Sequence, residues 1–206
     1  MNWLSTNFAP GSIMVFALGM LCAYLAGSVN FSILLFRLLG KGDPRSQFSG
    51  NPGVTNVFRQ AGWTVAGLVL LLDVGRAAGV ALAASHFLRV HLVPWAGFGL
   101  ILGNHFPCFH KFKGGKGVAN YLGFCAILLP MGTVLGVVTY LTVFAIFRIP
   151  FIASFGMLAV LAGFGLGHWW PDIPGIAAVI ATTAAIVWFH RGNIASLSQR
   201  KQLPKV

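Results

Sequence analysis

The chain has 206 residues, of which 57% are hydrophobic and 8% are charged, and its only acidic residues are three aspartates. Soluble domains typically carry about 25% charged residues, so this composition excludes a soluble globular fold and indicates a polytopic membrane protein. The net charge of +11 comes from cations scattered through short loops between apolar stretches. That distribution argues against nucleic acid as a partner, because no single basic face is formed.

Seven apolar stretches predict seven membrane-spanning helices. They cover residues 12–38, 63–88, 92–105, 117–129, 131–147, 151–168 and 173–190. The third and fourth stretches are short for a full crossing, which predicts broken or tilted helices around the loop between them. The expected fold is therefore an all-α integral membrane protein, with residues 1–206 forming a single domain.

The basic residues predict how these spans are oriented. Of the 14 cations, Arg37 and Arg76 fall inside spans. With the N-terminus outside, Arg89 alone falls in an outer loop, and all the others fall on the inner side. Cytoplasmic loops are enriched in Lys and Arg, so we expect an external N-terminus and a cytoplasmic C-terminus. All the candidate motifs then lie at the cytoplasmic side.

The loop between the third and fourth spans, residues 105–117, combines cations with glycines. Glycines allow the backbone to approach a phosphate closely, and a helix that begins near Val118 points the positive end of its dipole at the same place. The loop therefore predicts an anion site at a membrane surface. The candidate ligands are His105, Lys113, Gly114, Gly115 and Lys116. The alternative is a basic loop that only fixes the orientation of the chain.

A second polar segment precedes the second span and ends at Arg59. Its glycines permit a nest of backbone N–H groups, its amides and hydroxyls are hydrogen-bond donors, and an arginine suits bidentate contact with phosphate. The candidates are Ser49, Asn51, Thr55, Asn56 and Arg59. The alternative is a turn followed by a helix that Ser49 or Asn51 caps, with Arg59 anchored at the lipid headgroups.

Polar residues inside or at the ends of spans supply the remaining candidates. Asp73 and Arg76 lie three residues apart, on one helical face, and a charge facing lipid is costly. We therefore expect this pair to face the protein interior, either as a structural ion pair or as a substrate contact. Ser154, His190 and Asn193 occur near span ends. A serine bonded to its own helix and an interfacial anchor at His190 are the alternatives there.

Several chemistries are excluded by missing motifs. The chain has no nucleotide P-loop, no Gly-x-Ser-x-Gly elbow, no His-x4-Asp pair and no acidic metal cluster. We expect no metal and no cofactor. An enzyme that handles phosphate without these groups works by positioning and by cationic stabilisation of charge.

The motifs together resemble one family. They are Ala23-Tyr-Leu-Ala-Gly-Ser28, Ser49-Gly-Asn-Pro-Gly-Val-Thr-Asn56 with Arg59, the loop that runs from His105 through Lys-Gly-Gly-Lys-Gly to Ala119, and His190-Arg-Gly-Asn-Ile194. Their order is similar to that of the PlsY family, the bacterial acyl-phosphate:glycerol-3-phosphate acyltransferases. The chain departs from the family pattern at Arg76, where the family usually has lysine, and at Asn120, where it usually has threonine.

This resemblance implies transfer of an acyl group from acyl phosphate to the sn-1 hydroxyl of glycerol 3-phosphate, giving lysophosphatidate and phosphate. It implies a bacterial inner-membrane protein whose site faces the cytoplasm among membrane lipids, coupled to an enzyme that makes acyl phosphate. It also implies phosphate binding by the 49–59 segment and the 113–116 loop. The implied catalytic residues are Lys116, Ser154, His190 and Asn193. Either the substrate's own phosphate or His190 acts as the base.

A different class of function is also open. A small anion transporter or a phospholipid-binding protein would use cationic loops as well. A transporter places its site near the midplane and usually shows inverted repeats, whereas these motifs gather at one surface and no repeat is visible.

Overall fold

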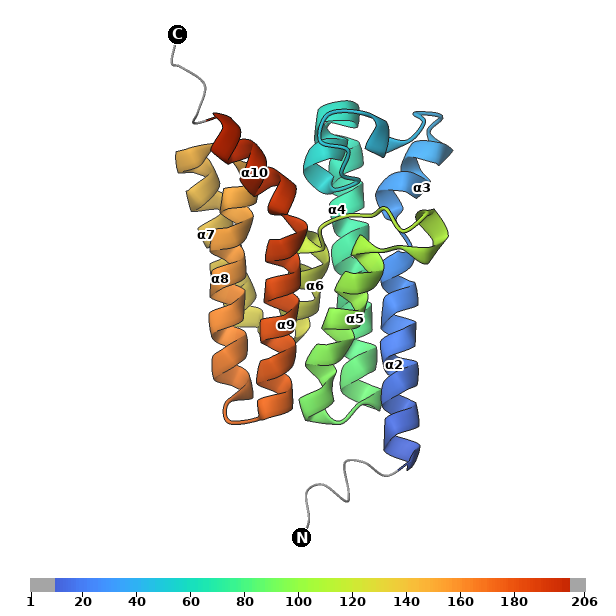
Figure 1. The fold of residues 1–206 in the computed structure, drawn as a ribbon, viewed down its shortest axis with the longest axis vertical. Helices are drawn as coiled ribbons and strands as arrows, with labels where there is room; N and C mark the ends of the chain where they lie inside the picture. Colours follow the sequence, from blue (N-terminus) through green and yellow to red (C-terminus); the bar gives the residue numbers. More distant parts are fainter. Residues whose placement is uncertain (1–9, 201–206) are drawn as a thin grey trace.

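The computed structural model describes residues 10–200, and within that range the protein is built from helices without any strand. Figure 1 shows the helices side by side in one bundle. The longer helices are α2 (Pro10–Ser28), α3 (Phe31–Leu38), α4 (Val54–Phe87), α5 (Val93–His105), α6 (Val118–Leu128), α7 (Pro130–Phe147), α8 (Pro150–Trp169), α9 (Ile173–Phe189) and α10 (Arg191–Arg200). Short 3-10 turns connect them at η1 (Pro44–Ser46), η2 (Val90–Leu92) and η3 (Cys108–His110).

Two helices differ from the spans predicted by hydropathy. The first predicted span, 12–38, is broken between α2 and α3, where the Asn30 side chain caps α3 by accepting a hydrogen bond from the backbone N–H of Ile33 at 3.1 Å. α4 begins at Val54 rather than at residue 63, and it bends at Gly62, whose φ of 77° suits glycine. The additional turns of α4 are polar, so a search for continuous apolar stretches does not detect them.

The length of the helices separates full crossings from shorter ones. Residues 13–38, α4, α7 and α8 are each long and apolar enough to cross a membrane, and α9 with α10 forms a further candidate that bends by 48°. α5 has 13 residues and α6 has 11, so they extend about 20 and 17 Å against a hydrocarbon core of about 30 Å. The expectation of short helices on both sides of the 106–117 loop is confirmed, and the count of seven crossings stays a prediction.

The short helices are enclosed by close backbone contacts at glycines. α5 packs against α2, and α6 packs against α4. A Cβ atom on Gly103 of α5 would lie 2.0 Å from the carbonyl oxygen of Tyr24, and one on Gly123 of α6 would lie 2.4 Å from the carbonyl oxygen of Val74. No side chain fits at either position, because these distances are far below van der Waals contact.

These contacts predict the effect of adding one methyl group. We expect Gly123→Ala to lower the free energy of unfolding by about 1–3 kcal/mol, because α6 must move away from α4. Gly79→Ala is the matched control, since no atom lies within 4 Å of a Cβ at that position in α4. The free energy of unfolding of the two variants is measured in mixed micelles and compared with that of the wild type. Equal stability of both would contradict the close contact between α4 and α6.

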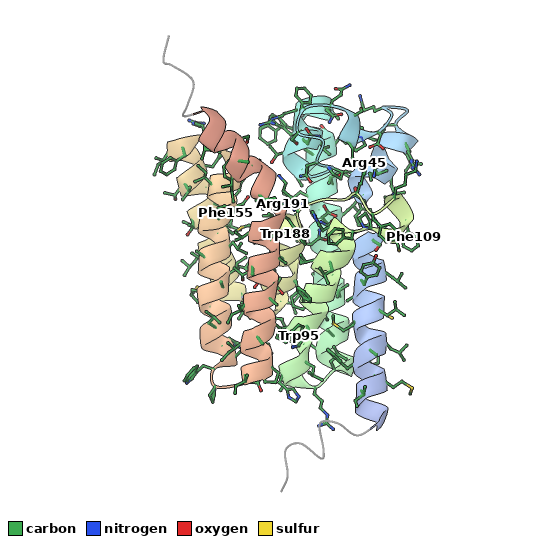
Figure 2. All side chains as sticks on the ribbon, viewed as in Figure 1. Arg45, Trp95, Phe109, Phe155, Trp188 and Arg191 are labelled. Atoms are coloured by element: carbon green, nitrogen blue, oxygen red, sulfur yellow. The ribbon has the colours of Figure 1, made fainter. Side chains whose placement is uncertain are left out.

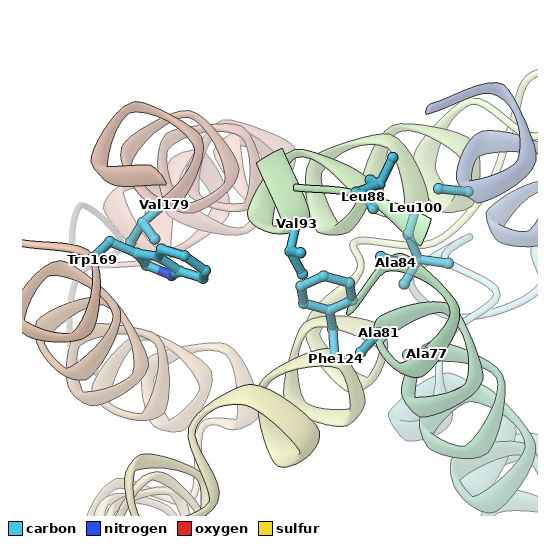
Figure 3. Packing of buried hydrophobic residues seen from close by; sticks show 11 residues of the cluster. Ala77, Ala81, Ala84, Leu88, Val93, Leu100, Phe124, Trp169 and Val179 are labelled. Atoms are coloured by element: carbon cyan, nitrogen blue, oxygen red, sulfur yellow. The ribbon is translucent and has the colours of Figure 1, made fainter. Parts of the chain in front are cut away.

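An apolar cluster with members from α2, α4, α5, α6, α8 and α9 packs the interior of the bundle (Figure 3). The ring of Phe124 in α6 is buried against α5, within 3 Å of where a Cβ on Gly97 would lie. Its other neighbours in the cluster include the small residues Ala77, Ala81 and Ala84 of α4. Small side chains on α4 leave room for this ring, so Phe124 packs α6 against both α4 and α5.

The polar segments gather at one end of the bundle. α10, the end of α3 and the first turns of α4 lie together there, and the 106–117 loop crosses the bundle just beneath them (Figure 1). The N-terminal end of α2 lies at the opposite end. This arrangement brings segments that are far apart in the sequence to one site.

Candidate active site

One cavity of about 870 Å³ opens at this polar end. Its polar wall contains Ser49, Asn51, Thr55, Asn56, Arg59, Asp73, Asn104, Gly115, Lys116, Asn120, Ser154, His190 and Asn193. Its apolar wall includes Leu70, Leu122, Val137, Tyr140, Leu141 and Met157, which come from α4, α6, α7 and α8. A cavity with one polar and one apolar wall suits an amphiphilic ligand.

Lys116 places a cation in the cavity just before α6 begins. Its Nζ atom donates a hydrogen bond to Oδ1 of Asn193, in the first turn of α10. Burial lowers the pKa of Lys116 below its usual value of 10.5, because desolvation disfavours the charged form. The contact joins two motifs that are 77 residues apart in the sequence.

The glycines before Lys116 fit against the end of α5. A Cβ on Gly114 would lie 2.0 Å from the carbonyl oxygen of Asn104, and the backbone N–H of Gly115 donates to that same oxygen at 2.9 Å. Gly114 and Lys113 do not line the cavity, whereas Gly115 does. Close packing on Asn104 thus accounts for the glycine at position 114, and Lys113 is an exposed side chain outside the cavity wall. Their role as phosphate ligands stays a prediction.

His105 contacts this loop through a hydrogen bond to its backbone. Its Nδ1 atom donates to the carbonyl oxygen of Gly115 at 2.7 Å, since a carbonyl can only accept. Its ring stacks on Phe189 with the centroids 3.5 Å apart. His105 is absent from the cavity wall, so the structure places it as a support of the loop, and its role as a ligand stays a prediction.

The segment before α4 divides into structural and accessible residues. Asn56 is buried, and its Nδ2 atom donates to the carbonyl oxygens of Pro44 at 2.9 Å and Gln47 at 3.3 Å. Thr55 and Arg59 are exposed on the first turns of α4. Within residues 10–200 no hydrogen bond to the Arg59 guanidinium is formed, so this cation remains available to a ligand.

The alternative interpretation of this segment as a side-chain cap is wrong. The N-cap of α4 is Gly53, and no side chain hydrogen-bonds to the free backbone N–H groups there. Ser49 and Asn51 line the cavity instead. The start of α4 thus leaves donors unpaired beside these two side chains, as an anion site requires.

Asp73 and Arg76 face the protein interior, as predicted. Arg76 donates from Nη2 to Oδ1 of Asp73 at 2.8 Å and to Oδ1 of Asn120 at 2.5 Å. Its Nη1 atom donates to the carbonyl oxygen of Val29, which the break between α2 and α3 leaves free. Asp73 and Asn120 line the cavity, whereas Arg76 does not. The network therefore joins the break between α2 and α3 to α4 and α6 beside the cavity.

His190 and Ser154 complete the wall. His190 is buried, and its Nδ1 atom donates to the carbonyl oxygen of Ile186 at 2.8 Å, which leaves Nε2 without a hydrogen bond in the described structure. Ser154 donates to its own helix at the carbonyl oxygen of Pro150, at 2.9 Å, so its hydroxyl oxygen can still accept. Arg191, by contrast, is exposed and its guanidinium lies 4.1 Å from the ring centre of Trp188 (Figure 2).

Two asparagines in the wall were missed by the sequence analysis. Asn104 and Asn120 are 4% and 2% exposed, and both belong to short apolar helices. A polar side chain within an apolar helix usually faces a cavity or a partner, and this signal was available in the sequence.

A comparison with known families decides the assignment. The family model described as glycerol-3-phosphate acyltransferase matches residues 17–200. The chain belongs to the glycerol-3-phosphate acyltransferase family. Members of this family from Methylobacillus flagellatus and Jannaschia are 38% and 39% identical to it, over 88% and 95% of this chain and 92% and 95% of theirs.

Solved structures support the same assignment. The fold resembles a crystal structure of PlsY, described as an integral membrane glycerol 3-phosphate acyltransferase in its glycerol 3-phosphate form. The TM-score is 0.82 at 30% identity, with 93% of this chain and 96% of the other covered. A second PlsY structure, in its lysophosphatidic acid form, gives a TM-score of 0.80. Membership of this acyltransferase family, which the motif order predicted, is confirmed.

Proposed function

We propose that this acyltransferase moves a fatty acyl group from acyl phosphate to the sn-1 hydroxyl of glycerol 3-phosphate, producing lysophosphatidate and inorganic phosphate. This is the first acylation step of phospholipid synthesis. The observation that carries the proposal is a single cavity with cations in its polar wall and aliphatic side chains in its apolar wall. Both substrates are phosphate esters or anhydrides, and one of them carries a long apolar tail.

The polar wall supplies the contacts that phosphoryl groups need. Arg59 and Lys116 hold the two phosphates by charge, and Arg59 can do so with two parallel hydrogen bonds. Asn193 keeps Lys116 oriented through its Oδ1 atom. Ser49, Asn51 and Thr55 add neutral donors near the start of α4. These groups are present before the substrates bind, so they stabilise developing charge without reorganisation.

The chemical step needs a group that accepts the hydroxyl proton. The glycerol oxygen attacks the acyl carbonyl carbon, the bond from that carbon to the phosphate oxygen breaks, and the phosphate leaves. We propose that this leaving phosphate takes the proton. His190 is the rival base, because Nε2 has no hydrogen bond in the described structure while Nδ1 donates to Ile186. A His190→Gln variant that keeps nearly full turnover eliminates this rival, and a collapse of kcat at unchanged KM supports it.

The acyl tail lies along the apolar wall between α4, α6 and α7. Each methylene buried there contributes about 0.8 kcal/mol. Access from the lipid phase matches the position of the cavity among helices that are apolar enough to cross a membrane.

We propose seven crossings in the bacterial inner membrane, with the N-terminus outside and the site facing the cytoplasm. The distribution of cations supports this orientation, and so do the opposite positions of the two ends of the described chain (Figure 1). Labelling of single cysteines at residues 89 and 113 by a membrane-impermeant maleimide in intact cells tests it. Only residue 89 should react from outside. The donor then reaches the site from an enzyme that makes acyl phosphate on the cytoplasmic side.

Turnover by the reconstituted protein tests the reaction itself. Lipid-reconstituted protein receives palmitoyl phosphate with and without glycerol 3-phosphate, and phosphate release and lipid products are measured together. Release that depends on glycerol 3-phosphate, with an equal amount of lysophosphatidate, establishes the reaction. A folded protein that binds phosphate and forms no lipid product directs the search to other acceptors and then to anion transport.

The lowered pKa of Lys116 predicts how activity depends on pH. Lys116 is protonated below its pKa and neutral above it, so phosphate binding weakens as pH rises through that value. The pH at which kcat/KM for glycerol 3-phosphate declines on the alkaline side should therefore lie below 10.5. Lys116→Arg should move this decline to higher pH, because arginine stays charged. A pH profile that is identical for both proteins contradicts this assignment.

A further inference from the structure

Arg45 contacts both loops that carry the proposed phosphate ligands, although it does not line the cavity. It lies in η1, between α3 and α4, and its side chain is 18% exposed (Figure 2). Its Nε and Nη2 atoms donate to the carboxylate of Asp43 at 2.9 and 2.6 Å. Its Nη1 atom donates to the backbone carbonyl oxygens of His110 at 2.8 Å and Lys113 at 2.9 Å.

Most N–H donors of the Arg45 guanidinium form hydrogen bonds with other protein groups. An arginine side chain has five N–H donors, and the contacts to Asp43 and to the two carbonyls use four of them. The bond from Arg45 lowers the pKa of Asp43, so the carboxylate is ionised at neutral pH. Arg45 is thus engaged within the protein, unlike Arg59, which has no hydrogen bond within residues 10–200 and lines the cavity.

The two carbonyls bracket a strained turn. Lys111 and Phe112 lie between them and have φ angles of 58° and 55°. Non-glycine residues in this left-handed region cost of order 1–2 kcal/mol each. Because Arg45 binds the carbonyl just before and the carbonyl just after this pair, it stabilises the turn that leads to Lys116.

The η1 turn that carries Arg45 is itself held to α4 by hydrogen bonds. The carbonyl oxygen of Pro44, next to Arg45, accepts hydrogen bonds from Nδ2 of Asn56 at 2.9 Å and from Nε2 of Gln60 at 2.8 Å. Asn56 and Gln60 flank Arg59 on the first turns of α4. A shift of η1 therefore moves Arg59 relative to the 106–117 loop.

We propose that Arg45 is a positioning residue that holds Lys116 and Arg59 at the separation which the phosphate groups of the two substrates require. This inference rests on the proposed function, because it assigns substrate phosphates to these two cations. Arg45 acts through the loops and touches no substrate. A lysine can replace it only in part, since a single ammonium cannot bind a carboxylate side-on and two carbonyls at once.

Kinetics of Arg45→Met, Arg45→Lys and Arg37→Met test the inference. Arg37 is the matched control, because it is an exposed cation at the end of α3 with no side-chain hydrogen bond in the described structure. We expect Arg45→Met to raise KM for glycerol 3-phosphate about tenfold, with a smaller fall in kcat. The alkaline limb of kcat/KM should also move to higher pH, because a released loop exposes Lys116 to water. Arg45→Lys should recover only part of the loss, and Arg37→Met should behave like the wild type.

Three results would overturn the inference. They are an unchanged KM and alkaline limb in Arg45→Met, full recovery by Arg45→Lys, and an equal defect in Arg37→Met, which would indicate a general effect of positive charge. If Arg45→Met does not fold, Asp43→Asn replaces it, since it removes the anion that orients Arg45, and the same partial loss is expected.

Binding of inorganic phosphate separates this inference from the proposed function. If the wild type forms no lysophosphatidate, the proposed function fails for these substrates. Titration calorimetry with inorganic phosphate then still compares the wild type with Arg45→Lys. Weaker binding to the variant supports the positioning role, and equal binding overturns it.

Discussion

Replacing Lys116 by alanine is expected to lower kcat/KM for glycerol 3-phosphate by about 10²–10³-fold, the usual effect of removing one preorganised charge from a site. Lys116 is the cation that faces the cavity from the loop before α6, and its Nζ atom contacts Asn193. Its loss leaves substrate phosphate with less compensating charge in a partly desolvated site. Steady-state assays of the reconstituted protein measure the effect, and circular dichroism confirms that the variant is folded.

The variant Lys113→Ala tests whether Lys113 is a ligand, as the motif suggests, or lies outside the site, as its position in the structure indicates. The motif suggests both lysines as ligands, but Lys113 is exposed and lies outside the cavity wall. Exposed charges are screened by salt, so we expect its kcat/KM to stay within about threefold of the wild type. A defect as large as that of Lys116→Ala would show that the substrates extend out of the cavity over this loop.

Arg76→Met should destabilise the protein by about 3–5 kcal/mol, because it leaves the buried carboxylate of Asp73 without its partner. It also leaves the carbonyl oxygen of Val29 and the side chain of Asn120 without the donor that now joins them. Unfolding in mixed micelles measures the loss.

The double variant Asp73→Leu with Arg76→Met decides between the two interpretations of this pair. Removing both charges should recover much of the stability, since no ion is left buried alone. If the pair is structural, activity returns with stability. If Asp73 contacts substrate, the double variant is stable and still inactive. A double variant as unstable as Arg76→Met would contradict the attribution of the loss to an unpaired charge.

The fold and the family could be predicted from the sequence, because the patterns that indicate them involve residues close together in the chain. Hydropathy located α5 to α9 within one or two residues at each end, since a lipid environment demands continuous apolar stretches. Family membership followed from short motifs that occur in a fixed order. The inward-facing pair in α4 was predicted because a charge facing lipid is costly.

The site residues could be predicted from the sequence only in part, because residues in one loop can point in different directions. Lys113 and Lys116 belong to the same motif, and the packing of Gly114 and His105 decides that only Lys116 faces the cavity. Asn104 and Asn120 become wall residues only when α5 and α6 are placed beside α4.

The sequence by itself thus determined the helical membrane fold, the extent of most helices and the family. The tertiary structure alone decided the break between α2 and α3, the early start of α4, and the connection of two loops through Arg45. The physical reason is that apolar periodicity and motif order are properties of neighbouring residues. The hydrogen bonds of Arg45 to His110 and Lys113 join groups more than 60 residues apart, and only the folded chain brings such groups together.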